Sequence, residues 1–142
     1  MVEARANKDE LTDMYVKIVR SIVELAVPVW HSSLTMDEIH DIERVQKCAL
    51  RVILGDEYQS YPCALKTCNL ESLEMRRDKL CTKFALKAEK HAMYKNWFKV
   101  RTYDRTRLKD KYEQVRARTE RLKRGPISNL VNSLNDHYRS LP

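Results

Sequence analysis

The chain has 142 residues, a net charge of +7, and only two glycines and four prolines. This length is enough for one hydrophobic core, and the abundance of Leu, Lys, Arg, Glu and Ala favours helix over most of it. No apolar run reaches the roughly 20 residues of a membrane span, and the polar N-terminus is unlike a signal peptide, so we expect an intracellular protein, nuclear or cytoplasmic and not secreted.

The first predicted helix spans residues 8–26. Asn7 can cap its N-terminus, and Pro28 disfavours helical geometry in the residue before it. Apolar residues recur here at spacings of three and four, which predicts one buried stripe. The stripe consists of Leu11, Tyr15, Ile18, Ile22 and Leu25.

A Pro28-Val29-Trp30 corner precedes a second predicted helix, and Trp30 can fill the angle between the two. Thr35 and Glu38 have the spacing of a capping box at the start of this helix, and Gly55 tolerates the positive φ that often ends one. Its predicted buried stripe consists of Ile39, Ile42, Val45, Ala49, Val52 and Ile53.

Two further helices are predicted at about residues 62–67 and 73–91. Pro62 suits the first turn of the shorter one, which Asn69 ends, and Ser72 can cap the longer one. The spacing of a packed helix marks the inner face of the longer helix. This face consists of Leu70, Leu73, Arg77, Leu80, Phe84 and Ala88.

Beyond residue 92 the pattern is less regular. Residues 93–106 can be helix or loop, and residues 107–124 form either a solvated arm or a helix lying on a partner. Gly125-Pro126 is a break before a last short helix at about residues 126–138. We predict an all-α, irregular bundle of about four to six helices, in which residues 1–92 form the bundle and residues 93–142 a basic C-terminal extension.

Charge is distributed unevenly along the chain. Residues 1–45 hold five basic and nine acidic residues, whereas residues 76–124 hold 18 basic and six acidic ones. A surplus of this size is typical of a surface that faces a polyanion. We therefore expect an RNA or DNA backbone as the partner, bound weakly and without sequence specificity, and no membrane.

The predicted nucleic-acid-binding residues lie in the helix at residues 73–91. Lys83, Lys87 and Lys90 recur at helical spacing on the face away from Leu80 and Phe84, so they can meet a phosphate backbone together. Arg76 and Arg77 open the same helix and complete the predicted set. The alternative interpretation is a helix face that is merely solvated.

Three aromatic residues, Trp97, Phe98 and Tyr103, lie among basic residues just after this helix. Such side chains can stack on unpaired bases, as they do in single-strand-binding proteins. They can equally anchor the segment to the core, and we expect the anchoring role.

No metal, cofactor or catalytic site is predicted. The cysteines Cys48, Cys63, Cys68 and Cys81 lack the regular pairing of a zinc site, and we expect reduced thiols that pack as small apolar groups. No Asp-Asp dipeptide occurs in the chain. The adjacent acidic pairs lie at predicted helix starts or in a turn, where helix capping explains them.

Several blocks of sequence resemble, in the same order and spacing, the thumb and post-thumb region of non-LTR retrotransposon reverse transcriptases of the jockey-like or LINE type. The earlier blocks are Tyr15, Ile18, Arg20-Ser21, Glu24, Pro28-Val29-Trp30, IERVQ at 42–46, ALRVILG at 49–55, Tyr58, Tyr61 and Ala64-Leu65. The later blocks are Leu70, Leu73-Glu74, Arg76-Arg77, Leu80-Cys81, Lys83-Phe84-Ala85, Arg118-Thr119-Glu120-Arg121, Pro126-Ile127, Leu130-Val131 and Leu134-Asn135.

This resemblance implies a non-catalytic fragment of an RNA-directed DNA polymerase. The family's aromatic-x-Asp-Asp signature, whose aspartates hold the catalytic metal ions, is absent from this chain. The implied partners are therefore the template-primer or RNA and the missing palm and fingers, with self-association through an apolar face as a further expectation. The alternative is a helical protein–protein interaction module with no role in binding nucleic acid.

Overall fold

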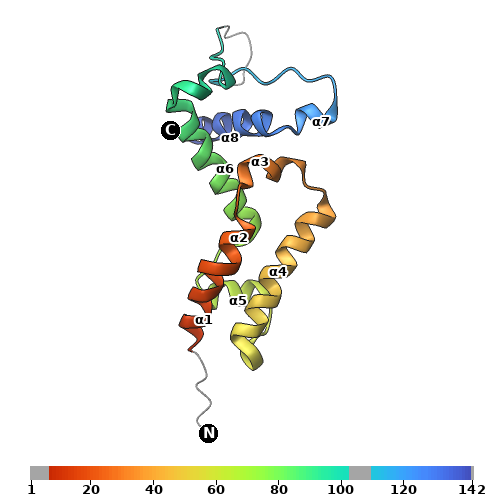
Figure 1. Ribbon diagram of the computed structural model, residues 1–142, viewed down its shortest axis with the longest axis vertical. Helices are drawn as coiled ribbons and strands as arrows, with labels where there is room; N and C mark the ends of the chain where they lie inside the picture. Colours follow the sequence, from red (N-terminus) through yellow and green to blue (C-terminus); the bar gives the residue numbers. More distant parts are fainter. Residues whose placement is uncertain (1–6, 103–109, 142) are drawn as a thin grey trace. The chain divides into compact units, whose positions relative to one another are not determined.

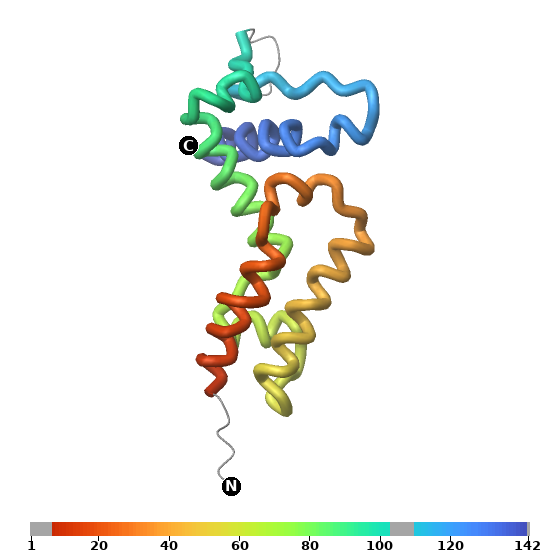
Figure 2. The backbone as a smooth tube through the Cα atoms, viewed as in Figure 1, coloured from red at the N-terminus to blue at the C-terminus, as the bar shows by residue number. Residues whose placement is uncertain are grey.

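A computed structural model describes residues 7–102 and 110–141, and it confirms the all-α fold (Figures 1 and 2). The α-helices are α1 (Lys8–Met14), α2 (Ser21–Val23), α3 (Val27–Trp30), α4 (Met36–Leu54), α5 (Tyr61–Thr67), α6 (Leu73–Lys90), α7 (Glu120–Lys123) and α8 (Pro126–Ser140). A π-helical segment (Tyr15–Arg20) joins α1 to α2, and 3-10 turns occupy His31–Ser33, Gly55–Glu57 and Ala92–Trp97.

The chain divides into two compact units. The first unit contains Met1–Leu25 and Thr35–Arg76, and the second contains Ala26–Leu34 and Arg77–Pro142. The sequence predicted a boundary between residues 92 and 93. This position lies inside the second unit and not at the end of any of its segments. The reason is that the C-terminal part of α6 shares a core with α8, which the sequence assigned to a separate extension.

The core of the first unit is built from the N-terminal helix, α4 and α5. Its buried members are Tyr15, Leu50, Ile53, Leu54 and Ala64, and partly buried side chains including Leu11, Val16 and Val19 pack against them.

The predicted stripe of the N-terminal helix is therefore wrong in its second half. Ile18, Ile22 and Leu25 are 55%, 69% and 73% exposed. The π-helical segment explains this difference, because one additional residue in a turn rotates the following side chains by about 100°. Val16 and Val19 face the core instead, and the sequence pattern contains no signal for this rotation.

Helix α4 begins and ends as predicted. The Thr35 hydroxyl accepts a hydrogen bond from the Glu38 amide at 3.3 Å, and the Glu38 carboxylate accepts one from the Thr35 amide at 2.7 Å. These bonds lower the pKa of Glu38, led by the one from the Thr35 backbone. Gly55 has a φ of 52°, a conformation in which a side chain would be strained.

The buried stripe of α4 differs from the prediction at two valines and one glutamine. Val45 and Val52 are 42% and 77% exposed, whereas Gln46 is completely buried. The Gln46 side chain accepts a hydrogen bond from the Tyr15 hydroxyl at 2.8 Å and donates one to the Glu71 carbonyl at 2.9 Å. Burial raises the pKa of Tyr15 to about 12, so its hydroxyl remains a donor. Gln46 can be buried in place of the neighbouring Val45 because both its amide oxygen and its amide nitrogen form hydrogen bonds.

The connection from α5 to α6 also follows the sequence signals. Asn69 adopts a φ of 50° after α5, and the Ser72 hydroxyl accepts a hydrogen bond from the Met75 amide at 3.3 Å. The Glu43 carboxylate of α4 accepts a second bond at this end of α6, from the Leu73 amide at 3.3 Å. A carboxylate at a helix N-terminus is favoured by the helix dipole.

The core of the second unit lies where α8 crosses the C-terminal part of α6 (Figure 1). It is formed by Val27, Cys81, Ala85, Ala88, Phe98, Tyr112, Leu130, Val131 and Leu134. Trp30 of α3 is partly buried against this core, and α3 packs on α8.

Residues 99–101 and 111–113 form a short antiparallel pairing beside this core. The Glu113 amide donates to the Lys99 carbonyl at 2.8 Å, and the Arg101 amide donates to the Lys111 carbonyl at 3.1 Å. The Asn135 side chain of α8 bonds both the amide and the carbonyl of Tyr112, at 3.0 and 3.1 Å. This buried amide holds the segment on α8 as a neighbouring strand would.

The carboxylate of Glu89 joins three parts of the second unit. It accepts hydrogen bonds from Lys111 at 2.8 Å, from Tyr138 at 2.8 and 3.0 Å, and from the Tyr112 hydroxyl. The Lys111 ammonium also lies 3.9 Å from the centre of the Tyr138 ring. Burial opposes the charged form of Glu89, but these bonds outweigh it and lower the pKa of the carboxyl.

Replacing Glu89 tests whether this carboxylate stabilises the second unit. We expect Glu89→Gln to lower the free energy of unfolding at pH 7 by about 1–3 kcal/mol, because it removes the negative charge and replaces one of the two acceptor oxygens with an amino group that cannot accept. The pKa of Glu89 is lower in the folded state, so its contribution is present above the unfolded value of about 4.3 and is lost as the pH falls through the folded value.

The difference in the free energy of unfolding between Glu89→Gln and the unchanged protein should therefore shrink below about pH 4. Urea unfolding at pH 7 and at several values between pH 4 and 3 measures it. Glu113→Gln is the matched control, because the side chain of Glu113 is exposed. A difference between Glu89→Gln and the unchanged protein that is the same at every pH would contradict this role.

Candidate nucleic-acid interface

The exposed side of α6 carries the lysines predicted to bind nucleic acid. Lys83, Lys87 and Lys90 are all exposed, and none forms an ion pair with the residues that the structure describes. Their α-carbons span about 10 Å of the helix axis, because seven residues rise 1.5 Å each. We call these three residues the lysine ladder.

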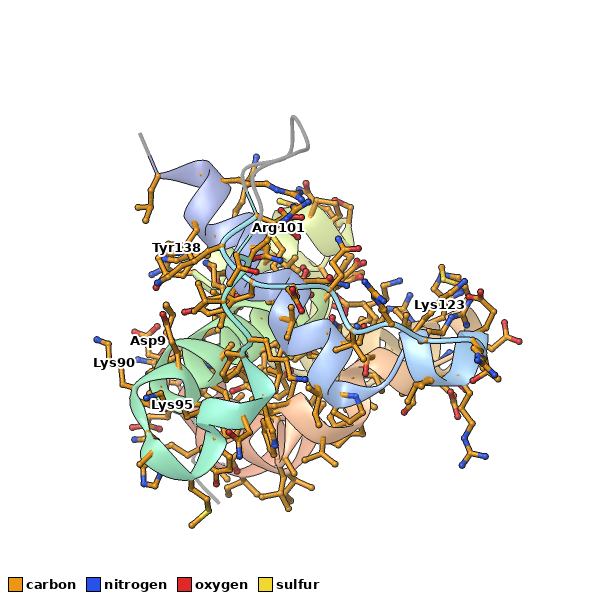
Figure 3. The ribbon with its side chains drawn as sticks, turned by 90° about the horizontal axis from the view of Figure 1, so that it is seen from above. Asp9, Lys90, Lys95, Arg101, Lys123 and Tyr138 are labelled. Carbon is orange, nitrogen blue, oxygen red and sulfur yellow. The ribbon has the colours of Figure 1, made fainter. Side chains whose placement is uncertain are left out.

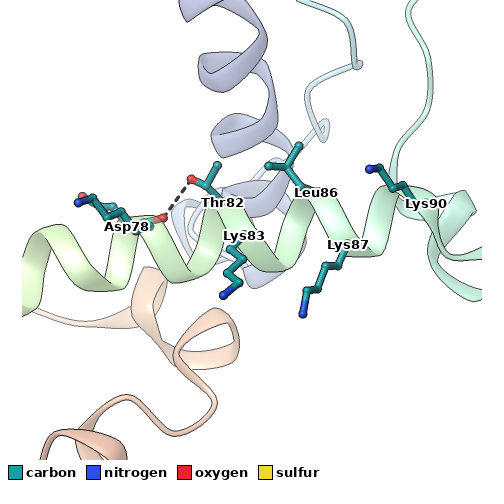
Figure 4. A pocket seen from close by; sticks show the side chains of 7 residues that line it. Asp78, Thr82, Lys83, Leu86, Lys87 and Lys90 are labelled. Atoms are coloured by element: carbon teal, nitrogen blue, oxygen red, sulfur yellow. Dashed lines mark hydrogen bonds between the residues drawn. The ribbon is translucent and has the colours of Figure 1, made fainter. Parts of the chain in front are cut away.

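The ladder borders a groove of about 510 Å³ along α6 (Figure 4). Lys83 and Lys87 extend to one side of the helix, whereas Thr82 and Leu86 extend to the other, and Lys90 turns toward that second side. Lysine stems and Leu86 thus form an apolar floor with ammonium groups along both edges. Asp78, the acidic residue of this groove, lies 3.0 Å from His31 Nε2.

Arg76 is engaged by another residue of its own unit. Its guanidinium donates two hydrogen bonds of 2.9 Å to the Glu24 carboxylate, in the paired geometry typical of strong arginine–carboxylate contacts. This contact raises the pKa of Arg76, and the Arg20 guanidinium lies 3.4 Å from the same carboxylate. The guanidinium of Arg76 is therefore already paired within the fold and is less available to a phosphate.

Arg77 is excluded from the interface by its burial. It is 1% exposed, and its guanidinium nitrogens make no hydrogen bond with the described part of the chain. Its neighbours on the same face, Leu73 and Cys81, are equally buried. The sequence assigned Arg77 both to the inner face and to the nucleic-acid-binding set, and the structure corrects the second assignment, because a phosphate cannot reach a side chain in this position.

Two basic residues elsewhere in the second unit are paired with carboxylates. Lys111 is held by Glu89, and Lys123 of α7 pairs with Glu120 at 2.5 Å. Seen from above, Lys123 also lies far from Lys90 and Lys95, which are on the opposite side of the view (Figure 3). On α6 itself the ladder is accessible, and Lys79, which borders the same groove, is exposed as well.

The aromatic residues after α6 separate into two environments. Phe98 is 6% exposed within the core, which agrees with the anchoring role. Trp97 is only partly buried, and its ring centre lies 4.7 Å from that of Tyr94. Tyr103 lies outside the described residues.

The described residues provide neither a disulfide nor a metal centre. All four cysteines are free thiols, and burial raises the pKa of Cys81 to about 11. Within residues 7–102 and 110–141 there is no group of three or more His, Cys, Asp or Glu side chains placed to hold a metal ion. None of the helices in these ranges has the length and apolar character needed to cross a membrane.

Comparison of the chain with protein-family models, with curated proteins and with solved structures finds no match.

Two neighbouring arginines provide a test of this arrangement. We expect Arg76→Met to lower the free energy of unfolding by about 1–3 kcal/mol, because it removes both hydrogen bonds to a carboxylate that is only 15% exposed. We expect Arg77→Met to leave stability unchanged or raise it by about 1 kcal/mol, because it replaces an unpaired buried charge with an apolar chain. Urea unfolding of both variants measures this, and a larger loss for Arg77→Met would show that its guanidinium has a partner.

Proposed function

We propose that this chain binds nucleic acid through the lysine ladder of α6, as a non-catalytic thumb and post-thumb region of a retrotransposon reverse transcriptase. The observation that carries the proposal is that Lys83, Lys87 and Lys90 are exposed and unpaired on one helix. Binding to phosphate therefore breaks no ion pair within the described residues, in contrast to binding through Arg76.

The chemistry of the ladder favours the sugar–phosphate backbone over the bases. Lysine carries a compact charge on a flexible stem, whereas specific base contacts are commonly made by the planar fork of arginine. Contacts to phosphate position a strand without reading its sequence. The ladder therefore supports binding to RNA and DNA alike, without sequence preference.

The ordered blocks of sequence support the reverse transcriptase assignment. In such an enzyme the thumb would lie along the backbone of the template-primer, and the palm and fingers would supply the aspartates that this chain lacks. The proposed partners are accordingly a nucleic-acid backbone and those missing domains. An open reading frame that encodes an aromatic-x-Asp-Asp segment directly upstream of the Met1 codon would support this origin.

Charge reversal of the ladder tests the proposed binding. We expect Lys83→Glu/Lys87→Glu/Lys90→Glu to weaken binding to a labelled RNA–DNA duplex at least tenfold in 50 mM salt. The plot of log affinity against log salt should also lose about 2–3 units of slope, since each phosphate contact accounts for about 0.7–0.9. Fluorescence anisotropy at several salt concentrations measures both quantities.

The matched control reverses three exposed basic residues of the first unit, Lys17, Arg44 and Lys66. This variant changes the net charge by the same amount but leaves the ladder intact. The proposal requires the ladder variant to lose far more affinity than the control. Equal losses would mean that net charge alone attracts the nucleic acid.

An exposed apolar stripe favours a second candidate function, a protein interaction module. Met14, Ile18, Ile22 and Leu25 recur along the N-terminal helix at spacings of four, four and three, and they are 54–73% exposed. Such a row exceeds the isolated apolar side chains that are normal on a protein surface. The palm of a parent polymerase or a second copy of this chain would cover it.

Substitution within this stripe tests the second candidate. We expect Ile18→Glu/Ile22→Glu to abolish any self-association seen by analytical ultracentrifugation, because two carboxylates cannot be buried in an apolar contact. Met36→Glu/Val52→Glu, two substitutions at exposed apolar positions of α4, is the control. A chain that remains monomeric at high concentration with the unchanged stripe would exclude the second copy as its partner.

A further inference from the structure

A second hollow in the second unit lies beside Trp97. It has a volume of about 560 Å³ and is bordered by the paired segments before and after the region of residues 103–109, together with the start of α8. Its apolar wall is formed by Trp97, Val115 and Ile127. The volume falls within the range of small-molecule sites, and an indole beside two aliphatic side chains is a surface suited to a flat ring.

The indole of Trp97 contacts another aromatic ring. Tyr94 packs against it with ring centres 4.7 Å apart, and the neighbouring Phe98 is buried in the core. Trp97 itself is only partly buried, because it borders the hollow. A ligand ring that stacks here therefore meets an aromatic side chain that is already ordered, which reduces the entropy lost on binding.

Polar groups around the hollow match the remaining parts of a nucleotide. Lys99 and Arg116 are exposed cations at its border, and they can pair with phosphates on either side of a bound base. Asn96 and Gln114 supply amides that can donate to or accept from a base edge. The Glu113 carboxylate is an acceptor, so it can receive a hydrogen bond from an N–H group of a base, such as the amino group of adenine or cytosine.

We propose that this hollow receives one unpaired nucleobase, stacked on Trp97, while Lys99 and Arg116 contact the adjoining phosphates. The inference rests on the proposed binding of nucleic acid and adds a preference to it. A base within a duplex is stacked between its neighbours and cannot enter, so the hollow favours single strands. The ladder supplies general attraction, and the hollow supplies selectivity for unpaired bases.

The experiment compares two single-stranded ligands that carry the same charge. One is a fluorescently labelled RNA of four adenosines, and the other is the same chain with abasic sugars. For the unchanged protein we expect the adenosine strand to bind about tenfold more tightly, since stacking of one base on an aromatic side chain has an effect of this size. Equal affinities for the two strands would overturn the proposal.

Two variants identify where the base binds. Trp97→Leu should abolish the preference for the adenosine strand. Because Trp97 also contacts the core, Ile127→Trp provides a second variant, which fills the hollow from the exposed start of α8 and leaves Trp97 in place. Both should bring the affinity ratio close to one. A ratio that stays near ten in Ile127→Trp, with folding confirmed by circular dichroism, would place the base elsewhere.

The ladder variant separates this inference from the proposed function. Lys83→Glu/Lys87→Glu/Lys90→Glu should weaken binding of both strands while the ratio between them stays near ten. Trp97 fluorescence gives an independent readout in a Trp30→Phe background, because the chain has only two tryptophans. Adenosine strands should quench this emission and abasic strands should not. If the ladder variant binds as tightly as the unchanged protein, the proposed role of the ladder is wrong. If adenosine strands still quench Trp97 in that variant, the proposed base site beside Trp97 remains supported.

Discussion

The packing of α6 on α8 decides which side of α6 meets water. Cys81, Ala85 and Ala88 of α6 share one buried core with Leu130 and Leu134 of α8. Once this face is buried, helical geometry leaves Lys83, Lys87 and Lys90 outside. The candidate interface therefore depends on an apolar contact that contains none of its own residues, and a change in that contact would rotate the ladder away from solvent.

Positive charge on this protein is not equivalent to charge that a ligand can reach. Arg76 is held by Glu24, Arg77 is buried, and Lys111 is held by Glu89. The ladder lysines differ because no acidic residue lies three or four positions before or after any of them. Pairing and burial thus remove these three residues from the sequence surplus, whereas the ladder lysines stay exposed, as do Lys99 and Arg116 beside Trp97.

The groove along α6 and the hollow beside Trp97 have proposed roles that differ in chemistry and complement each other. Ammonium groups along α6 attract any phosphate backbone, and this attraction weakens with salt. The hollow beside Trp97 offers an aromatic surface whose contribution depends much less on salt, because stacking is not a charge interaction. The apolar stripe on the N-terminal helix has a third chemistry, which suits a protein partner.

Local signals in the sequence determined most of the helices. The capping box at Thr35, the positive φ of Gly55 and Asn69, and the cap at Ser72 each depend on a residue and its near neighbours, so they could be predicted. The exposure of the ladder could be predicted for the same reason. Tertiary structure alone decided that Gln46 is buried and Ile22 is not, because a π-helical turn and distant partners at Tyr15 and Glu71 set those positions. Tertiary structure also decided the environments of Arg76 and Arg77. The sequence shows that both side chains are charged, but only the fold places the carboxylate of Glu24, 52 residues away, beside Arg76 and buries Arg77.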